Sequence, residues 1–491
     1  MEHYESFGEC LRRCLQEADL SASELARLMK LRSRNSIFRI LAGDASPDVC
    51  LRFLGALHNT LGDKWPHERW IALQEALSVE RLGEVGYRSR QAFEQVLYGK
   101  PVPFDAVVEK MNPDDTEDFL SLSAILDKAS AAPWAEIVIT GCCDSGLTRL
   151  LAERCAKAGA EGRLKLRQYI YTAADCVTQN ILGVLPLMAM PWYNARLVQP
   201  DDCPEEAIAL YRMHALHILY QAEDGLAGGM FVRLDKEHFA SRMVTRGAID
   251  FIRVLDKHRF DLELLKPLPK ADAGAEAFVE FTETYRELES DCLICSIKPD
   301  VHFNLLPADV LESAVRDGFR QMNIADGDAL DALITALKDI HLRRLDNMLT
   351  KRKPTHIIYS LPAMERFMRT GVQTDHFFVQ RAYTAAERRT IVRLLLDTMQ
   401  HNPWFNVYFL RDAAPELRYE ISMYGEKGVL LTDAFTGYEL QDDHSDALIT
   451  LPGFISSFRT YFMDELLPHH VLPRAENLRL LEQLIGMDIQ D

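Results

Sequence analysis

The hydrophobic pattern of this chain changes character at residue 135, and the change restricts the folds that the chain can adopt. Before that point, apolar residues recur at the spacing of amphipathic helices. After it, short runs rich in β-branched residues, such as residues 135–140 and 356–359, alternate with helical segments such as residues 385–400. We therefore expect a multidomain protein: an all-α N-terminal domain followed by a large mixed α/β region. We find no internal sequence repeat.

Residues 19–43 carry the signals of two short helices separated by a tight turn. Ser21 followed by Glu24 is a capping box that opens the first helix. Its expected apolar face comprises Leu25, Leu28 and Met29. Ser33 is the expected cap of the second helix, and Gly43 is its expected C′ residue, which can take a positive φ. Two short helices around a tight turn predict a helix-turn-helix.

This arrangement resembles the lambda-repressor-like, Cro/CI-type (XRE) helix-turn-helix family over about residues 7–58. The resemblance rests on Leu20, Ser21, Glu24, Leu25, Ala26, Ile37, Arg39, Ile40 and Gly43, with a Pro-containing loop at 45–47 and a helix from Asp48. It implies that the second helix of the motif lies in the major groove of DNA. One departure is the turn, which is one residue longer than the commonest form and has Lys30 where glycine is usual.

Positive charge gathers on this motif. Between Leu25 and Gly43 the chain has five basic residues and no acidic one. The N-terminal end of a recognition helix reaches base edges, so we expect Arg34, Asn35 and Phe38 to read guanine, adenine and the thymine methyl group. The expected phosphate contacts are Ser21, Ser23, Lys30, Arg32, Ser33 and Arg39. The alternative is a solvated basic face on a domain that binds protein.

The chain as a whole is acidic. It has 55 Lys and Arg against 73 Asp and Glu, a formal net charge of -18, which excludes a protein that coats nucleic acid along its whole surface. Residues 1–62 contain eight basic and eight acidic side chains, so the excess negative charge belongs to residues 63–491. The distribution restricts any DNA contact to the N-terminal end.

Residues 141–148 have the outline of a Walker A phosphate-binding loop. Leu147 stands where that motif requires lysine, so only backbone amides and Thr148 remain to meet a phosphate. We interpret the loop as a tight strand-to-helix turn. The alternative is a site for an anionic effector at the start of the following helix.

Two pairs of cysteine or histidine residues have the spacing of metal ligands, but neither pair has the further ligands that a metal site needs. Cys292 and Cys295 form a lone C-x-x-C with no second pair nearby, and we expect buried, reduced thiols. His214 and His217 lie three residues apart on a helix predicted over residues 205–222, and no third ligand completes the set. We therefore expect no catalytic residue, no metal site and no cofactor.

No targeting signal is evident in the sequence. The ten cysteines are scattered, no basic region followed by an apolar stretch opens the chain, and the strongly apolar run at 181–192 is too short to span a bilayer. These features predict a cytoplasmic protein that does not enter a membrane.

The resulting hypothesis assigns residues 1–62 to a helix-turn-helix DNA-binding domain, 63–130 to a helical connector, 131–268 to an α/β region and 269–491 to an α/β sensor or dimerisation region. We expect a sequence-specific transcriptional regulator rather than an enzyme. Its expected partners are double-stranded DNA, a second copy of the chain and a small-molecule effector. Two alternatives stay open: an enzyme acting on a nucleotide or small molecule with the helix-turn-helix as a localising module, and a protein–protein interaction protein.

Overall fold

The computed structural model describes residues 5–31, 33–98, 122–140, 145–173, 176–188, 190, 192–198, 215–221, 227–233, 241–243, 259–261, 275–299, 301, 306–321, 327–350, 352–372, 381–411, 417, 419–433 and 447–489. The chain divides into two compact units, Met1–Gln91 and Ala92–Asp491. The first is helical and the second is mixed α/β, as the sequence predicts at this level. The finer division into four segments stays a prediction.

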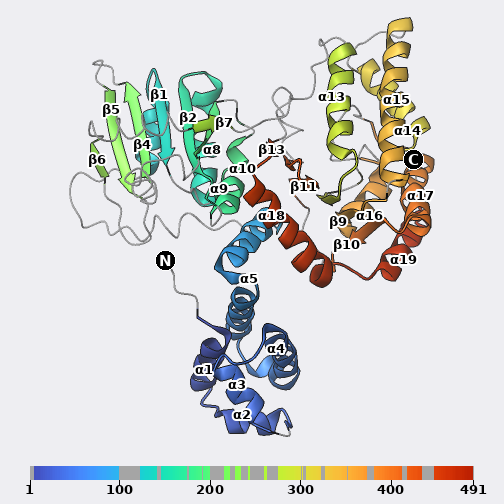
Figure 1. The fold of residues 1–491 in the computed structure, drawn as a ribbon. Coiled ribbons are helices and arrows are strands. Elements are labelled where there is room, and N and C mark those ends of the chain that lie inside the picture. The colour runs from blue at the N-terminus through green and yellow to red at the C-terminus, as the bar shows by residue number, and fades with distance from the viewer. Residues whose placement is uncertain are drawn as a thin grey trace. The chain divides into compact units, whose positions relative to one another are not determined.

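The described part of the first unit is helical throughout (Figure 1). Its elements are α1 (Phe7–Glu17), α2 (Ala22–Leu28), α3 (Asn35–Leu41), α4 (Pro47–Leu61), the 3₁₀ turn η1 (Gly62–Lys64) and most of α5 (His67–Tyr98). Gly83 interrupts α5 with a φ of 71°. The helices share one core, whose most deeply buried members include Phe7, Leu11, Leu25, Ile37, Leu57 and Leu73.

The bounds of α2 and α3 follow from local sequence signals. Ser21 and Glu24 form the predicted capping box at the start of α2. Gly43 takes the predicted positive φ, 77°, and its amide donates to Ile40 while the Asp44 amide donates to Arg39. This pair of hydrogen bonds is a Schellman motif, which closes α3.

One predicted core position of α2 is wrong. Leu28 is 43% exposed, whereas Leu25 and Ala26 are buried. The buried face of α2 is centred between Leu25 and Ala26, and at 100° per residue Leu28 lies beyond its edge.

The second unit contains two mixed sheets. The first has the order β6-β5-β4-β1-β2-β3-β7, and the second β10-β9-β8-β11-β12-β13. The first sheet consists of β1 (Ala135–Thr140), β2 (Leu164–Tyr171), β3 (Tyr193–Val198), β4 (Ala215–Gln221), β5 (Ala227–Arg233), β6 (Ser241–Met243) and β7 (Arg259–Asp261). The second consists of β8 (Ile294–Lys298), β9 (Thr355–Tyr359), β10 (Phe405–Phe409), β11 (Tyr419–Tyr424), β12 (Val429–Asp433) and β13 (Ala447–Ile449).

The two sheets have the same topology, so the unit contains a structural repeat. In each sheet, three consecutive strands are parallel, and the next strand in sequence pairs antiparallel with the first of them. Two further strands then extend this antiparallel edge as a meander. Among the described residues, the second sheet has no counterpart of β7. Pairing order is conserved between the halves although the sequence shows no repeat.

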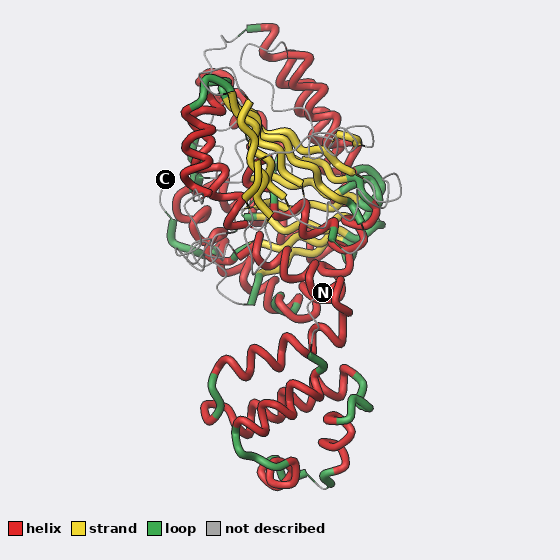
Figure 2. Tube along the Cα trace, turned by 90° about the vertical axis from the view of Figure 1, so that its left-hand side faces the viewer, coloured by secondary structure: helices red, strands yellow, loops and turns green. Residues whose placement is uncertain are grey.

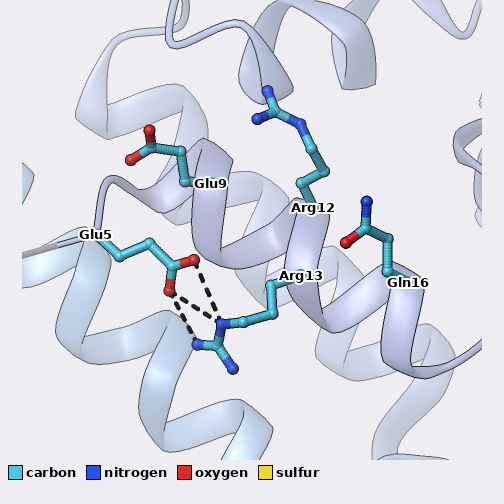
Figure 3. A pocket seen from close by; sticks show the side chains of 5 residues that line it. All are labelled: Glu5, Glu9, Arg12, Arg13 and Gln16. Carbon is cyan, nitrogen blue, oxygen red and sulfur yellow. Dashed lines mark hydrogen bonds and ion pairs between the residues drawn. The ribbon is translucent and has the colours of Figure 1, made fainter.

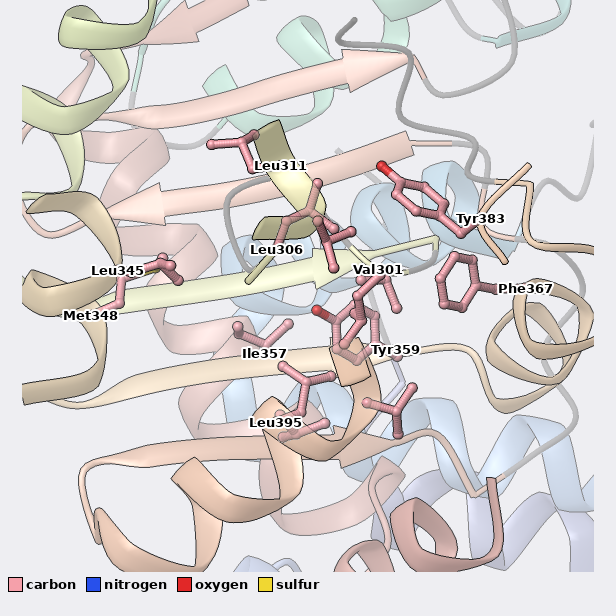
Figure 4. Packing of buried hydrophobic residues seen from close by; sticks show 14 of the residues in the cluster. Val301, Leu306, Leu311, Leu345, Met348, Ile357, Tyr359, Phe367, Tyr383 and Leu395 are labelled. Carbon is pink, nitrogen blue, oxygen red and sulfur yellow. The ribbon is translucent and has the colours of Figure 1, made fainter. Parts of the chain in front are cut away.

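Helices flank the strands of the second unit (Figure 2). They are α7 (Leu122–Ala131), α8 (Ser145–Ala160), α9 (Val177–Gly183), α10 (Leu185–Met188), α13 (Ala275–Glu289), α14 (Ala308–Gln321), α15 (Asp328–Thr350), α16 (Leu361–Thr370), α17 (Ala385–His401), α18 (Pro452–Thr460), the π-helical η5 (Tyr461–His470) and α19 (Arg474–Ile485). One face of the second sheet packs into a large core with Val301, Ile357, Tyr359 and Leu395 (Figure 4). Its other face shares a core with residues of α9, α18 and η5.

The helix predicted over residues 205–222 is wrong where the structure describes it. His217 lies in β4, where it pairs with Val138 of β1 and Phe231 of β5. The strand is stabilised by pairing with β1 and β5, and this outweighs the helix that the three-residue spacing of the histidines suggested. These pairings join residues far apart in sequence, so the local periodicity does not reveal them. His214 lies outside the described residues.

No helix among the described residues has the length and apolar character needed to cross a lipid bilayer. The apolar run at 181–192 forms parts of α9 and α10, and Ile181, Leu182, Val184 and Leu187 are buried in the α/β unit. His469 and His470 are the last two residues of η5.

Candidate nucleic-acid interface

Helix α3 is held by close contacts with α1. Its inner residues Ile37 and Ile40 are buried in the core of the first unit. Gly8 allows α1 to approach α3, because a Cβ at that position would overlap the carbonyl oxygen of Ile40. The Arg12 guanidinium donates to the carbonyl oxygen of Leu41 at 2.6 Å, at the C-terminal end of α3 where carbonyls lack helical partners. These contacts fix the position of α3 against its unit.

The outer surface of α2, the turn and α3 carries the predicted interface residues. All those that the structure describes are exposed: Ser21, Ser23, Lys30, Ser33, Arg34, Asn35, Phe38 and Arg39. Arg32 lies outside the described residues. Phe38 is 48% exposed, so its ring is accessible on the outer surface of α3.

The start of α3 differs from the prediction by one residue. Arg34, rather than Ser33, is the N-cap, and it makes no side-chain cap hydrogen bond. Ser33 still contributes, because its Oγ accepts from the Asn35 amide at 3.1 Å. The Arg34 guanidinium lies over the Phe38 ring, 5.9 Å from its centroid. Arg34, Asn35 and Phe38 thus lie together on the exposed first turn of α3.

The remaining predicted residues have distinct local roles. Lys30 adopts a φ of 51°, the left-handed conformation that glycine usually supplies at this turn. The Arg39 guanidinium donates to the Asp44 carbonyl at 3.1 Å. The Ser21 hydroxyl donates to Glu24 at 2.6 Å, so it is already engaged in the capping box. The same hydroxyl holds the pKa of Glu24 below its ordinary value.

A shallow hollow of about 560 Å³ lies on α1, lined by Glu5, Glu9, Arg12, Arg13 and Gln16 (Figure 3). Its charges are satisfied within the unit. Arg13 pairs with Glu5 at 2.9 Å and with Glu17 at 3.3 Å, and Arg12 is bound to Leu41. None of the predicted interface residues lines this hollow, and we assign it no ligand.

The motifs in the α/β unit that resemble chemical sites are parts of its core. Thr148 is buried and its hydroxyl donates to the Gly183 carbonyl at 2.6 Å, so it does not face a phosphate. Cys292 and Cys295 are buried free thiols, as predicted, and burial raises the pKa of Cys295 to about 12. Within the described ranges, no group of three or more His, Cys, Asp or Glu side chains is arranged to hold a metal ion.

The structure shows polar features that the sequence did not reveal. A cavity of about 600 Å³ opens on the first sheet and includes Glu136, Lys165, Arg167 and Arg196 in its lining. A buried ion pair joins Lys298 of β8 to Glu420 of β11 at 2.6 Å. The partners come from strands that are distant in sequence, and no local motif signals their meeting.

Comparison with known proteins identifies no family. No family model matches the chain, and no curated protein matches it. Among solved structures, the polyphosphate kinase from Porphyromonas gingivalis is similar at 12% sequence identity and a TM-score of 0.21. The similarity covers 74% of this chain and 53% of that kinase, so the match spans about half of the kinase's length. At that TM-score the similarity carries no argument about the fold or activity of this chain.

The expected transcriptional regulator with an effector-sensing region is corrected at this point. No family model and no curated protein supports a regulator, and the solved structure named above is that of a kinase. We do not carry the regulator hypothesis further.

Proposed function

We propose that the first unit is a helix-turn-helix module that binds duplex DNA and thereby localises an enzyme, whose α/β unit acts on a nucleotide or another small molecule. The observation that carries the first part is the exposed surface of α2, the turn and α3. From Leu25 to Gly43 this segment bears basic side chains and no acidic one. Such a surface attracts the phosphate backbone, whereas the acidic remainder of the chain is repelled by it.

In the proposed complex, the N-terminal turn of α3 faces the base edges in the major groove. Arg34 donates to guanine, Asn35 pairs with adenine, and Phe38 contacts a thymine methyl group. The position of the Arg34 guanidinium over the Phe38 ring restricts its rotamers before binding, so less side-chain entropy is lost on docking. Lys30 and Arg39 face phosphates, which fixes the register.

The second part of the proposal is supported by the cavity on the first sheet. Its volume of about 600 Å³ lies within the usual range of small-molecule sites, and its lining includes the charged residues Glu136, Lys165, Arg167 and Arg196. A helical unit of 91 residues suffices for DNA binding, so the larger unit has a separate activity to perform.

The test measures binding of the full-length chain to a labelled duplex at low salt, for the natural protein and for Arg34→Ala and Asn35→Ala. Loss of a bidentate base contact costs about 1–3 kcal/mol, so we expect about a five-fold to hundred-fold loss of affinity. Arg13→Ala is the matched control, because it removes an exposed arginine that is already paired with Glu5 and Glu17. We expect the control to bind within about two-fold of the natural protein.

Unchanged affinity in both Arg34→Ala and Asn35→Ala would contradict the assignment of α3 as the reading helix. Circular dichroism of each variant establishes that the helices of the first unit remain folded.

A further inference from the structure

We propose that α5 contains a hinge at Gly83, between a segment packed in the core of the first unit and a segment packed in a core of the α/β unit. The hinge allows α5 to change between a bent and a straight form. This inference goes beyond the proposed function, because it depends neither on DNA binding nor on a ligand of the α/β unit.

The two ends of α5 are anchored in different hydrophobic cores. Leu73 is buried in the core of the first unit, and the Glu80 carboxylate accepts from the Phe7 amide at 2.9 Å. Phe93, by contrast, is buried in a core of the α/β unit, where its ring stacks on Tyr461 with the centroids 5.1 Å apart. Each end of the helix is therefore fixed to its own core, and a change in the angle of α5 must occur between the two anchors.

Gly83 lies between these anchors in a backbone conformation that other residues avoid. Its φ of 71° and ψ of 166° fall in a region that is essentially restricted to glycine. Residues 83–85 are exposed, and a Cβ at Gly83 would meet nothing within 4 Å among the described residues. The open space beside Gly83 therefore leaves its backbone room to rotate.

A second glycine permits the same bend. A Cβ at Gly86 would lie 3.1 Å from the Cβ of Leu82. In a regular helix, residues four apart have Cβ atoms about 5–6 Å apart. The bend at Gly83 therefore brings positions 82 and 86 together, and glycine at position 86 leaves space for that approach.

A straight α5 is also accessible to this sequence. No proline lies between His67 and Tyr98, so every residue there can donate its amide to a helical hydrogen bond. Among the described residues of α5, Gly83 alone departs from helical φ and ψ, so rotation at this one residue converts one form into the other. The two glycines weaken the straight helix, whereas the bend interrupts its hydrogen bonds, and these opposing costs bring the two forms close in free energy.

A hinge at this position separates the motions of the two cores. Rotation at Gly83 leaves the packing of Leu73 and of Phe93 unchanged, because both lie outside the residues that rotate. A first unit bound to a duplex would thus let the α/β unit change its orientation, and this consequence alone rests on the proposed function.

Double electron–electron resonance on the full-length chain tests the hinge. Spin-labelled non-canonical residues replace Gln74 and Gln91, two exposed positions on either side of Gly83, so the ten native cysteines are not labelled. In a straight helix the backbones of these two positions lie about 26 Å apart, at about 1.5 Å per residue. The natural protein should give this distance together with a shorter distance from the bent form.

Gly83→Ala and Gly86→Ala should each shift the distribution toward the distance of the straight helix. Alanine disfavours the conformation of Gly83, and at position 86 it obstructs the approach of Leu82. Hydrogen exchange of residues 79–90 should slow about ten-fold in both variants, since a continuous helix protects these amides.

Val85→Ala is the matched control. Val85 is 43% exposed in the same turn of α5, and its substitution raises helix propensity while leaving both glycines in place. Residue 85 is helical in both forms, so this variant should keep the distance distribution of the natural protein.

Three results would overturn the proposal: a single narrow distance in the natural protein, a distribution that Gly83→Ala leaves unchanged, or an equal shift in Val85→Ala and Gly83→Ala. A hinge requires both forms, so a fixed bend contradicts it as clearly as a straight helix does. These measurements use neither DNA nor a ligand, so a failure of duplex binding would contradict the proposed function and not the hinge.

Discussion

Gly8→Ala tests whether the close approach of α1 fixes α3. A Cβ at Gly8 would overlap the Ile40 carbonyl oxygen and lie 3.1 Å from the Leu41 carbonyl oxygen. Both obstacles are backbone atoms, which cannot rotate away, so α1 and α3 must separate. Overpacking of this kind costs about 1–3 kcal/mol. The intrinsic helical advantage of alanine over glycine, about 0.5–1 kcal/mol, offsets only part of that cost.

Gly55→Ala is the matched control. Gly55 lies within α4, and a Cβ there has nothing within 4 Å. The control should therefore stabilise the first unit by about 0.5–1 kcal/mol, so the two substitutions have opposite expected signs.

The assay is hydrogen exchange of the full-length chain, resolved by mass spectrometry into peptides from α1 to α4. Amides of α1 and α3 should lose protection in Gly8→Ala and gain it in Gly55→Ala. Duplex affinity should fall in Gly8→Ala, because α3 moves relative to its unit. Protection in Gly8→Ala equal to or above that of Gly55→Ala would refute the argument that this contact fixes α3.

Two further predictions concern the α/β unit. Burial lowers the pKa of His341 and of His356 to about 4. Between pH 6.5 and 4 the unfolded chain therefore binds more protons than the folded chain. The free energy of unfolding is highest above pH 6.5 and falls as the pH is lowered toward 4. The free energy of unfolding should fall by up to about 3 kcal/mol per histidine across that pH range. Urea unfolding at pH 7 and pH 4.5 measures this difference, and equal unfolding free energies at the two pH values would contradict the burial argument. Glu289→Gln should cost about 3–5 kcal/mol in the same assay, because it leaves Arg344 buried without the carboxylate that now binds it at 2.8 and 2.9 Å. Asp339→Asn, which breaks an exposed ion pair with Arg343 on α15, the helix of Arg344, should cost at most about 0.5 kcal/mol, and equal costs for the two variants would count against the assigned burial.

The sequence predicted features that depend on neighbouring residues. The capping box at Ser21 and Glu24 and the positive φ of Gly43 are confirmed because a few consecutive residues determine each of them. The position of Leu28 was wrong because it depends on which side of α2 meets the rest of the unit. Local signals therefore define where helices begin and end more reliably than which side they bury.

Features that depend on strand pairing could not be predicted. The structural repeat is defined by strand order, and periodicity contains no information about order. His217 was placed on a helix because its partners Val138 and Phe231 lie on other strands. The cavity is likewise lined by Glu136 of β1 and Arg196 of β3, which are far apart in sequence. The two residues line one cavity because both strands pair with β2.

The salt dependence of duplex binding tests the central proposal most directly. Among the described residues from Leu25 to Gly43, the exposed basic side chains are Arg27, Lys30, Arg34 and Arg39. If two to four of them neutralise phosphates, log K should fall with log salt at a slope of about -2 to -4. The account predicts measurable binding at low ionic strength with a slope in this range, reduced by about one in Lys30→Ala. Absence of duplex binding at low salt, where the electrostatic attraction is strongest, would contradict it.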